Sequence, residues 1–140
     1  MPASAPAVSR LTPHRRVSLL TAGALAGILG PGRRFATDAQ LAAYAGVAPL
    51  EASSAGRVRH RLNRGGNRRL NAILYRIAVT QAGASAQAKA YLARRAADGK
   101  SRREALRAHK RHLVRAIWRL WQECLPGPAT AALPEARAAA

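Results

Sequence analysis

Residues 101–124, SRREALRAHKRHLVRAIWRLWQEC, predict the longest helix of the chain. Ser101 and Glu104 have the spacing of a capping box, in which the serine hydroxyl accepts the N–H of residue 104 and the glutamate accepts the N–H of residue 101. Apolar residues then recur every three or four positions, as one helix face requires, and they are Leu106, Leu113, Ile117, Leu120 and Trp121. Cations occupy other positions around the helix: Arg103, Arg107, Lys110, Arg111, Arg115 and Arg119. We therefore expect an amphipathic helix over about 102–124, with its apolar face against a core.

Two helices are expected near the start of the chain. The first covers about 14–29 and stops at the Gly-Pro-Gly of residues 30–32, because these residues break helices. Thr37 and Gln40 form a second capping-box pattern. They open a short helix that carries Leu41, Tyr44 and Ala45 and ends at Gly46 and Pro49.

Two more helices are expected between this pair and the long C-terminal helix. Asn67 caps a helix of about 68–83, and Ser85 caps one of about 86–97 that packs Tyr91 and Leu92. The buried stripe of the former is Leu70, Ile73, Leu74 and Ile77. No segment shows the two-residue alternation of a strand. The sequence thus predicts an all-α fold, a small bundle of four to five helices over residues 14–125, with a long basic loop. The Pro- and Ala-rich ends, 1–13 and 126–140, are expected to be disordered.

A long polar connection, residues 47–66, separates the second and third helices. Connections of this length inside a compact domain tend to be functional or disordered. Gly65 and Gly66 precede the cap Asn67, and glycines before a helix let the first N–H groups of that helix approach a phosphate. A plain cap with a flexible entry explains the same residues, so both interpretations stay open.

The charge of the chain points to a polyanionic partner. There are 24 Lys and Arg residues against 6 Asp and Glu, a formal net charge of +18. A domain this basic repels itself unless it meets an anion, and nucleic acid is the commonest such partner. A membrane surface is the weaker alternative, because packing on a core explains the apolar face of the 102–124 helix. No run reaches the ~18 apolar residues that span a bilayer.

A metal site is not expected in this chain. The six acids are scattered along the sequence: Asp38, Glu51, Asp98, Glu104, Glu123 and Glu135. Two-metal phosphoryl transfer needs carboxylates that converge on ions ~3.5–4 Å apart. His109 and His112 share a helix face, but no further ligand stands at a matching spacing, so both are interpreted as surface residues on a basic face. Cys124 is interpreted as a buried, inert thiol.

The serine pair Ser53-Ser54 lies within the long connection. Serines in loops are usually turn residues that form local hydrogen bonds. A nucleophilic serine needs help from a base, a metal or nearby cations, and Arg57, Arg59 and Arg61 follow closely. Arginines around a phosphodiester would bind its oxygens and offset the charge that develops on them. His60 could transfer a proton near neutral pH, or it could simply contact phosphate or solvent.

The order of features over residues 33–123 resembles the C-terminal transposase domain of DEDD-type insertion-sequence transposases, which include the pilin-gene-inverting (Piv-type) recombinases. The matching features are Phe35, AAYAGVAP at 42–49, the serine beside a small residue, the basic stretch, GGN at 65–67 before a helix with Leu70, YLARRAADGK at 91–100, and the Arg-rich helix with Trp118.

The resemblance implies a role in DNA transposition. Family members join a RuvC-like domain with four metal-binding acids to a helical C-terminal domain, whose serine attacks DNA and leaves a phosphoserine-linked intermediate. The usual pattern is Ser-Gly, whereas this chain has Ser54-Ala55-Gly56, so Ser54 is the preferred nucleophile and Ser53 the alternative. Mg²⁺ is expected only with the RuvC-like domain, and no cofactor is expected in this chain. DNA is the expected partner, some members also use a structured guide RNA, and an oligomer with full-length subunits is expected.

We therefore interpret the chain as a truncated, catalytically incomplete transposase fragment, with residues 17–32 as a remnant of the preceding segment and the bacterial nucleoid as its location. The alternatives are a stand-alone basic helical protein that binds nucleic acid without catalysis, and a non-functional remnant. The candidate nucleic-acid contacts are Arg57, Arg59, His60, Arg61, Arg64, Gly65, Gly66, Asn67, Arg68, Arg69, Arg107 and Arg111.

Overall fold

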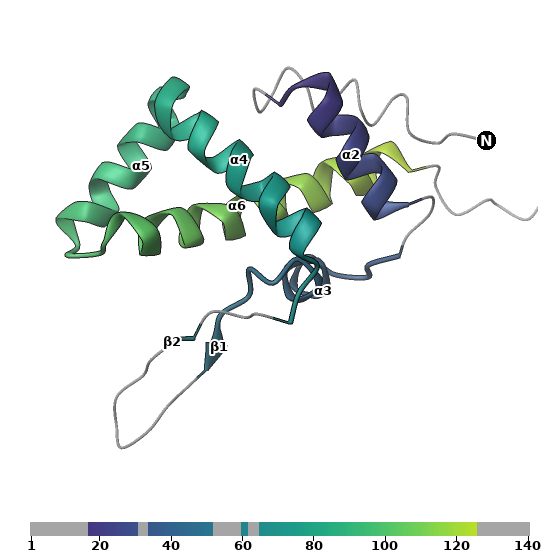
Figure 1. Cartoon of the computed structure of the whole chain (residues 1–140), viewed down its shortest axis with the longest axis horizontal. Helices are drawn as coiled ribbons and strands as arrows, with labels where there is room; N and C mark the ends of the chain where they lie inside the picture. The colour runs from purple at the N-terminus through teal and green to yellow at the C-terminus, as the bar shows by residue number, and fades with distance from the viewer. Residues whose placement is uncertain (1–16, 31–33, 52–59, 62–64, 126–140) are drawn as a thin grey trace, which may run out of the picture.

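The protein folds as an assembly of helices, as the sequence predicts (Figure 1). The structure is a computed structural model, and it describes residues 17–30, 34–51, 60–61 and 65–125. Both ends that were expected to be disordered, 1–13 and 126–140, lie outside these residues. The elements in chain order are α2 (Leu19–Leu29), α3 (Asp38–Tyr44), β1 (Leu50–Glu51), β2 (His60–Arg61), α4 (Arg68–Ala84), α5 (Ala86–Ala97) and α6 (Arg102–Cys124).

Helix α6 is the element on which most of the others pack. It contacts α3, α4 and α5, while α2 packs on α4 (Figure 1). Its start is the predicted capping box: Ser101 Oγ accepts the N–H of Glu104 at 3.3 Å, and Glu104 Oε2 accepts the N–H of Ser101 at 2.8 Å. The pKa of the Glu104 carboxyl is lowered, first by the backbone N–H of Ser101 and then by the Ser101 hydroxyl, which donates to Glu104 Oε2 at 2.9 Å. The cap thus fixes where the longest helix begins.

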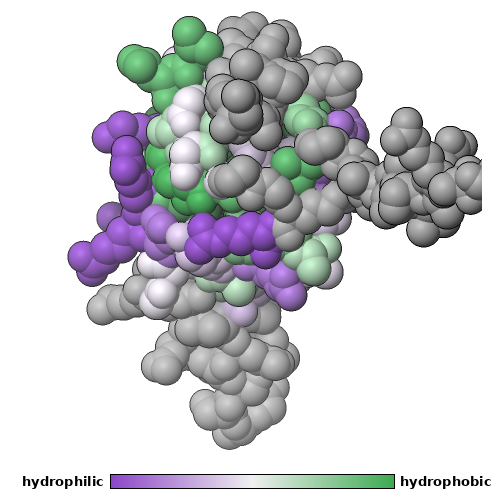
Figure 2. Space-filling model, turned by 90° about the vertical axis from the view of Figure 1, so that its right-hand side faces the viewer, coloured by the Kyte–Doolittle hydropathy of each residue, from purple (hydrophilic) through white to green (hydrophobic). Residues whose placement is uncertain are grey.

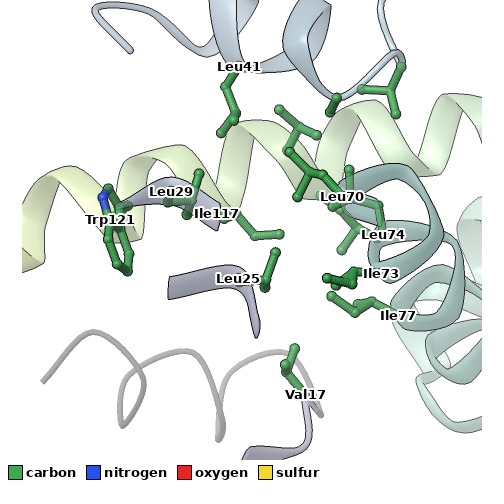
Figure 3. Packing of buried hydrophobic residues seen from close by; sticks show 14 of the residues in the cluster. Val17, Leu25, Leu29, Leu41, Leu70, Ile73, Leu74, Ile77, Ile117 and Trp121 are labelled. Carbon is green, nitrogen blue, oxygen red and sulfur yellow. The ribbon is translucent and has the colours of Figure 1, made fainter. Parts of the chain in front are cut away.

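The core lies where α2, α3, α4 and α6 meet, and Figure 3 shows its side chains converging from these elements. Helix α4 supplies the predicted stripe: Leu70, Ile73, Leu74 and Ile77. Helix α6 supplies Leu113, Val114, Ile117 and Trp121. Leu25 and Leu29 of α2 are almost completely buried against these residues. Helix α2, which lies in the segment 17–32 that was interpreted as a remnant, is therefore an integral part of the core.

Helix α2 begins later than the sequence suggested. Ser18 has an extended backbone and its hydroxyl accepts the N–H of Thr21 at 3.2 Å, so the helix starts at Leu19 rather than near residue 14. Leu19 and Leu20, in its first turn, are exposed. Figure 2 looks at this side of the molecule and shows apolar residues gathered toward the top, apart from the hydrophilic side chains below and to the left.

The long connection between α3 and α4 contains a short ladder that the sequence did not predict. Leu50 pairs with Arg61 and Glu51 with His60, antiparallel, as β1 and β2. Two residues a strand give no alternating pattern that a sequence could reveal. The ladder brings together the two ends of segment 52–59.

Two residues of α6 that were placed among its exposed polar positions are in fact buried. His109, expected on the surface, is buried and its Nε2 lies 3.0 Å from Gln81 Oε1 of α4. Lys110 is only 7% exposed. Both face neighbouring helices, because α4 and α5 pack on a wider arc of α6 than its apolar stripe suggests. His112 is exposed as predicted, and Cys124 is partly buried against the core.

Two features used to identify the resemblance, Phe35 and Trp118, contact each other. The Trp118 indole N–H donates to the carbonyl oxygen of Phe35 at 3.1 Å. The Phe35 ring lies 5.2 Å from that of Tyr44, measured between centroids. Nearby, Arg115 of α6 pairs with Asp38 of α3 at 3.0 Å. These contacts fix α3 on α6 and so place the end of α3 beside the start of α4.

Candidate nucleic-acid interface

The start of α4 is locked against the end of α3 by backbone contact. Gly66 lies so close to Gly46 that a Cβ on residue 66 would overlap the amide nitrogen and Cα of Gly46. Gly46 itself has φ of 69°, a conformation that favours glycine. The two glycines therefore let these two chain segments touch.

Asn67 closes this junction as the predicted cap. Its Oδ1 accepts the N–H of Leu70 at 2.9 Å, and its Nδ2 donates to Tyr44 Oη at 2.9 Å. The hydrogen bond from Asn67 is the largest cause of a lowered pKa for the Tyr44 hydroxyl, followed on the lowering side by Arg34. The backbone N–H of Asn67 also donates to the carbonyl of Tyr44 at 2.7 Å. The position of the α4 N-terminus is thus set by tertiary contacts as well as by its own cap.

One turn further along α4, Asn71 joins three segments. Its Nδ2 donates to the carbonyl oxygen of Ala45 at 3.0 Å, and its Oδ1 accepts from Lys110 Nζ of α6 at 3.0 Å. The Lys110 ammonium also lies 6.0 Å from the centroid of the Tyr75 ring. Asn71 therefore holds a buried lysine between α4 and α6.

These residues line a groove between α4 and α6, about 730 Å³ in volume. The lining comprises Arg68, Asn71, Ala72 and Tyr75 from α4, Arg103, Leu106, Arg107 and Lys110 from α6, and the glycines Gly46 and Gly66. The α4 residues recur at three- and four-residue spacing, and so do the α6 residues, because each set lies on one face of its helix. We call this feature the α4–α6 groove.

The α4–α6 groove is strongly positive. Four of its lining residues are cations and none is acidic. Two acids are paired outside the groove lining, Asp38 with Arg115 and Asp98 with Arg95, while Glu104 caps α6 and lies close enough to Arg107 to interact with its charge. Surfaces where cations converge without acids attract anions.

The surroundings of Lys110 in the groove lower its pKa. Burial is the largest cause of a lowered pKa for Lys110, and repulsion by the Arg107 guanidinium adds to it. Holding a charged ammonium in this position therefore costs free energy in the ligand-free protein. A bound anion would offset that cost.

The structure brings together some of the predicted contact residues. Gly66, Arg68 and Arg107 line the groove. Gly65, Arg69 and Arg111 are exposed outside its lining, and Asn67 is the cap. His60 and Arg61 form β2, and only their backbone is described. Ser53, Ser54, Arg57, Arg59 and Arg64 lie outside the described residues.

Sequence reasoning missed Asn71, Tyr75, Arg103 and Lys110 as lining residues. Arg103, Arg107 and Lys110 were visible as a row along one face of α6. Likewise, Arg68, Ala72 and Tyr75 have the spacing of one face of α4. The signal was present in each helix, but only the packing of α4 on α6 makes the two rows face each other.

Within the described residues, no three His, Cys, Asp or Glu side chains lie together. This part of the chain therefore does not fit a metal centre, and the expectation that Mg²⁺ is bound by another domain stays a prediction. None of the described helices is long and apolar enough to cross a membrane.

Comparison with known proteins gives the family. Residues 8–93 match the family model described as "Transposase IS116/IS110/IS902 family". This range runs from before α2 into α5 and includes both glycines of the junction. An insertion element IS110 uncharacterized 43.6 kDa protein of Streptomyces coelicolor is 36% identical over 97 residues, which cover 69% of this chain but only 24% of that relative. The chain belongs to the IS116/IS110/IS902 transposase family.

Proposed function

We propose that this chain acts in insertion-sequence transposition as the DNA-binding, serine-bearing domain of a transposase. The observation that carries the proposal is the α4–α6 groove, where Arg68, Arg103, Arg107 and Lys110 converge without an acidic residue. Exposed Arg69 and Arg111 extend the positive surface beyond it. Cations arranged in this way bind the phosphate backbone of nucleic acid without requiring a particular base sequence.

In this proposal the nucleophile that attacks DNA is a serine hydroxyl from the segment between β1 and β2. Ser53 and Ser54 belong to segment 52–59, whose two ends the ladder holds together. Ser54 Oγ would attack a backbone phosphorus, forming a Ser–O–P bond while the bond from phosphorus to one sugar oxygen breaks. The departing sugar oxygen takes up a proton, and the serine gives one up. The arginines that follow in sequence, Arg57, Arg59 and Arg61, would offset charge on the phosphate oxygens.

The remaining parts of the active site would come from elsewhere. The chain spans about a quarter of the length of its IS110 relative, 24%, and its described residues bring no metal-ligand set together. We assign to this chain the C-terminal role of a DEDD-type transposase, with the acids and Mg²⁺ supplied by a RuvC-like domain in the same assembly. Such an assembly implies an oligomer, and a structured guide RNA is a candidate partner.

The test combines this chain with the RuvC-like domain of a close relative and measures strand exchange and a covalent protein–DNA adduct. Ser54→Ala should abolish both, while Ser53→Ala should leave both in place. If Ser53→Ala alone removes the adduct, the nucleophile is Ser53. If strand exchange survives when Ser53→Ala and Ser54→Ala are combined in one protein, neither serine is the nucleophile.

A second function, a nucleic-acid-binding protein without catalysis, is favoured by the groove itself, because its converging cations serve binding and need no chemical step. Both functions predict that affinity falls steeply as salt rises. Only the covalent protein–DNA adduct separates the two functions. If DNA binding is intact but no adduct forms when the RuvC-like domain is present, the second function is favoured.

A further inference from the structure

The α4–α6 groove has an apolar part as well as a charged one. Ala72 and Leu106 line it beside the cations, and Tyr75 stands on its α4 wall with 51% of its surface exposed. Phosphate alone would require only the cations. A lining that sets an exposed aromatic ring beside four positive charges matches a ligand with both an aromatic face and an anionic group.

Tyr75 is placed to present its ring to such a ligand. The Lys110 ammonium lies 6.0 Å from the ring centroid, so a group stacked on Tyr75 would have its attached anion within reach of the buried lysine. Lys110 is itself fixed by its hydrogen bond to Asn71 Oδ1 at 3.0 Å. Asn71 in turn is fixed by the carbonyl of Ala45. The cation beside the ring is therefore preorganised rather than free to move in solvent.

A nucleotide has the required combination of groups. Its base stacks on aromatic side chains, and its phosphate binds Arg and Lys. The groove volume of about 730 Å³ lies within the ~300–1,000 Å³ typical of ligand pockets. In a duplex both faces of each base are covered by neighbouring base pairs, so only an unpaired or unstacked base can lie on Tyr75.

We infer that the α4–α6 groove holds an unpaired nucleotide of a DNA or RNA strand, with its base on Tyr75 and its phosphate between Arg68, Arg107 and Lys110. The inference rests on the proposed function, since it names the form of nucleic acid that this surface takes. It gives the groove a role distinct from general attraction to duplex DNA: it captures a segment where base pairing is interrupted.

The decisive variant is Tyr75→Leu in the full chain, measured with three probes of one base sequence: single-stranded DNA, single-stranded RNA and duplex DNA. The variant should bind single strands about 5- to 150-fold more weakly, the loss of one base–aromatic stack, while duplex affinity is unchanged. Tyr75→Phe keeps the ring and should bind like the original protein. Since Tyr75 is half exposed, the fold should survive both changes, which circular dichroism can check.

A matched pair of charge variants tests the phosphate end. Arg107 lines the groove, whereas Arg76 is exposed on α4 outside its lining. Arg107→Gln should reduce the slope of log affinity against log salt for single strands by about one contact. Arg76→Gln removes the same charge and should leave that slope unchanged.

The outcomes separate the two proposals. A Tyr75→Leu defect seen only with DNA or only with RNA supports the inference and identifies the strand. Single-strand affinity that Tyr75→Leu leaves intact, or a duplex defect of equal size, would overturn the inference while the proposed function stands. A protein that binds neither single strands nor duplex would overturn both.

Discussion

Gly66 and Gly46 touch backbone to backbone, so that a Cβ on residue 66 would overlap Gly46 and lie 2.9 Å from the carbonyl carbon of Ala45. This contact joins the end of α3 to the start of α4, two elements separated by the long connection. It also forms one end of the α4–α6 groove, which Gly46 and Gly66 line. The glycine pair therefore shapes both the fold and the candidate site.

Gly66→Ala should destabilise the protein because neither neighbouring backbone can move without disturbing the junction. We expect a loss of about 1–3 kcal/mol in the free energy of unfolding, as for other overpacked sites. Gly83→Ala, within α4, is the control, because a Cβ there meets nothing within 4 Å. It should be neutral or stabilise by up to ~1 kcal/mol. Denaturant unfolding followed by circular dichroism measures both, and equal stabilities would contradict the packing described.

Asn67→Ala should remove the cap of α4. The N–H of Leu70 loses its acceptor, which costs roughly 0.5–2 kcal/mol. Asn67→Ser should recover most of this loss, because a serine hydroxyl can cap a helix, although it lacks the amide that donates to Tyr44. If Asn67→Ser were as unstable as Asn67→Ala, the Tyr44 contact rather than the cap would dominate.

Leu25→Ala should show that α2 is part of the core. Leu25 is completely buried, so its truncation should cost about 2–5 kcal/mol. Leu20→Ala makes the same change in the same helix at a side chain that is 88% exposed, and it should stay within about 0.5 kcal/mol. Thermal unfolding measures both variants. Equal midpoints would mean that the core does not depend on α2.

Lys110 should make the free energy of unfolding depend on pH in the alkaline range. Its pKa is lowered in the folded protein from the ordinary value of 10.5, first by burial and then by Arg107. The folded state therefore releases this proton before the unfolded state does. The destabilising effect of the charged ammonium is fully present below the folded pKa and disappears as pH rises toward 10.5.

The comparison for this prediction is Lys110→Met, which lacks the titrating group. The free energy of unfolding of the original protein, relative to the variant, should rise as pH increases through the interval below 10.5. Unfolding midpoints of both proteins across that interval provide the measurement. A difference that stays constant with pH would mean that Lys110 titrates normally. Saturation with a single-stranded oligonucleotide should flatten the rise, because a phosphate favours the charged form.

Local sequence signals account for most of the helices and their starts. Asn67, Ser85 and Ser101 each cap a helix as predicted, because a cap depends on residues within one turn of it. The capping box predicted at Thr37 forms in part. The Thr37 hydroxyl accepts the N–H of Gln40, but the Gln40 side chain accepts the backbone N–H of Ala36 instead of that of Thr37. The β1–β2 ladder escaped prediction because pairing between Glu51 and His60 depends on chain segments meeting.

The sequence by itself determined that the chain is helical, strongly basic and marked by the Gly-Gly-Asn start of α4, since these follow from composition and from spacing within a few residues. Tertiary structure decided the rest. Arg107 and Arg68 stood in the sequence as separate cations, and Lys110 as one more charge on the outside of a helix. Only the packing of α4 on α6 buries Lys110 against Asn71, places Tyr75 beside it, and turns two helix faces into one groove. Spacing along one helix fixes which residues share a face, but which faces meet depends on contacts between residues far apart in the chain.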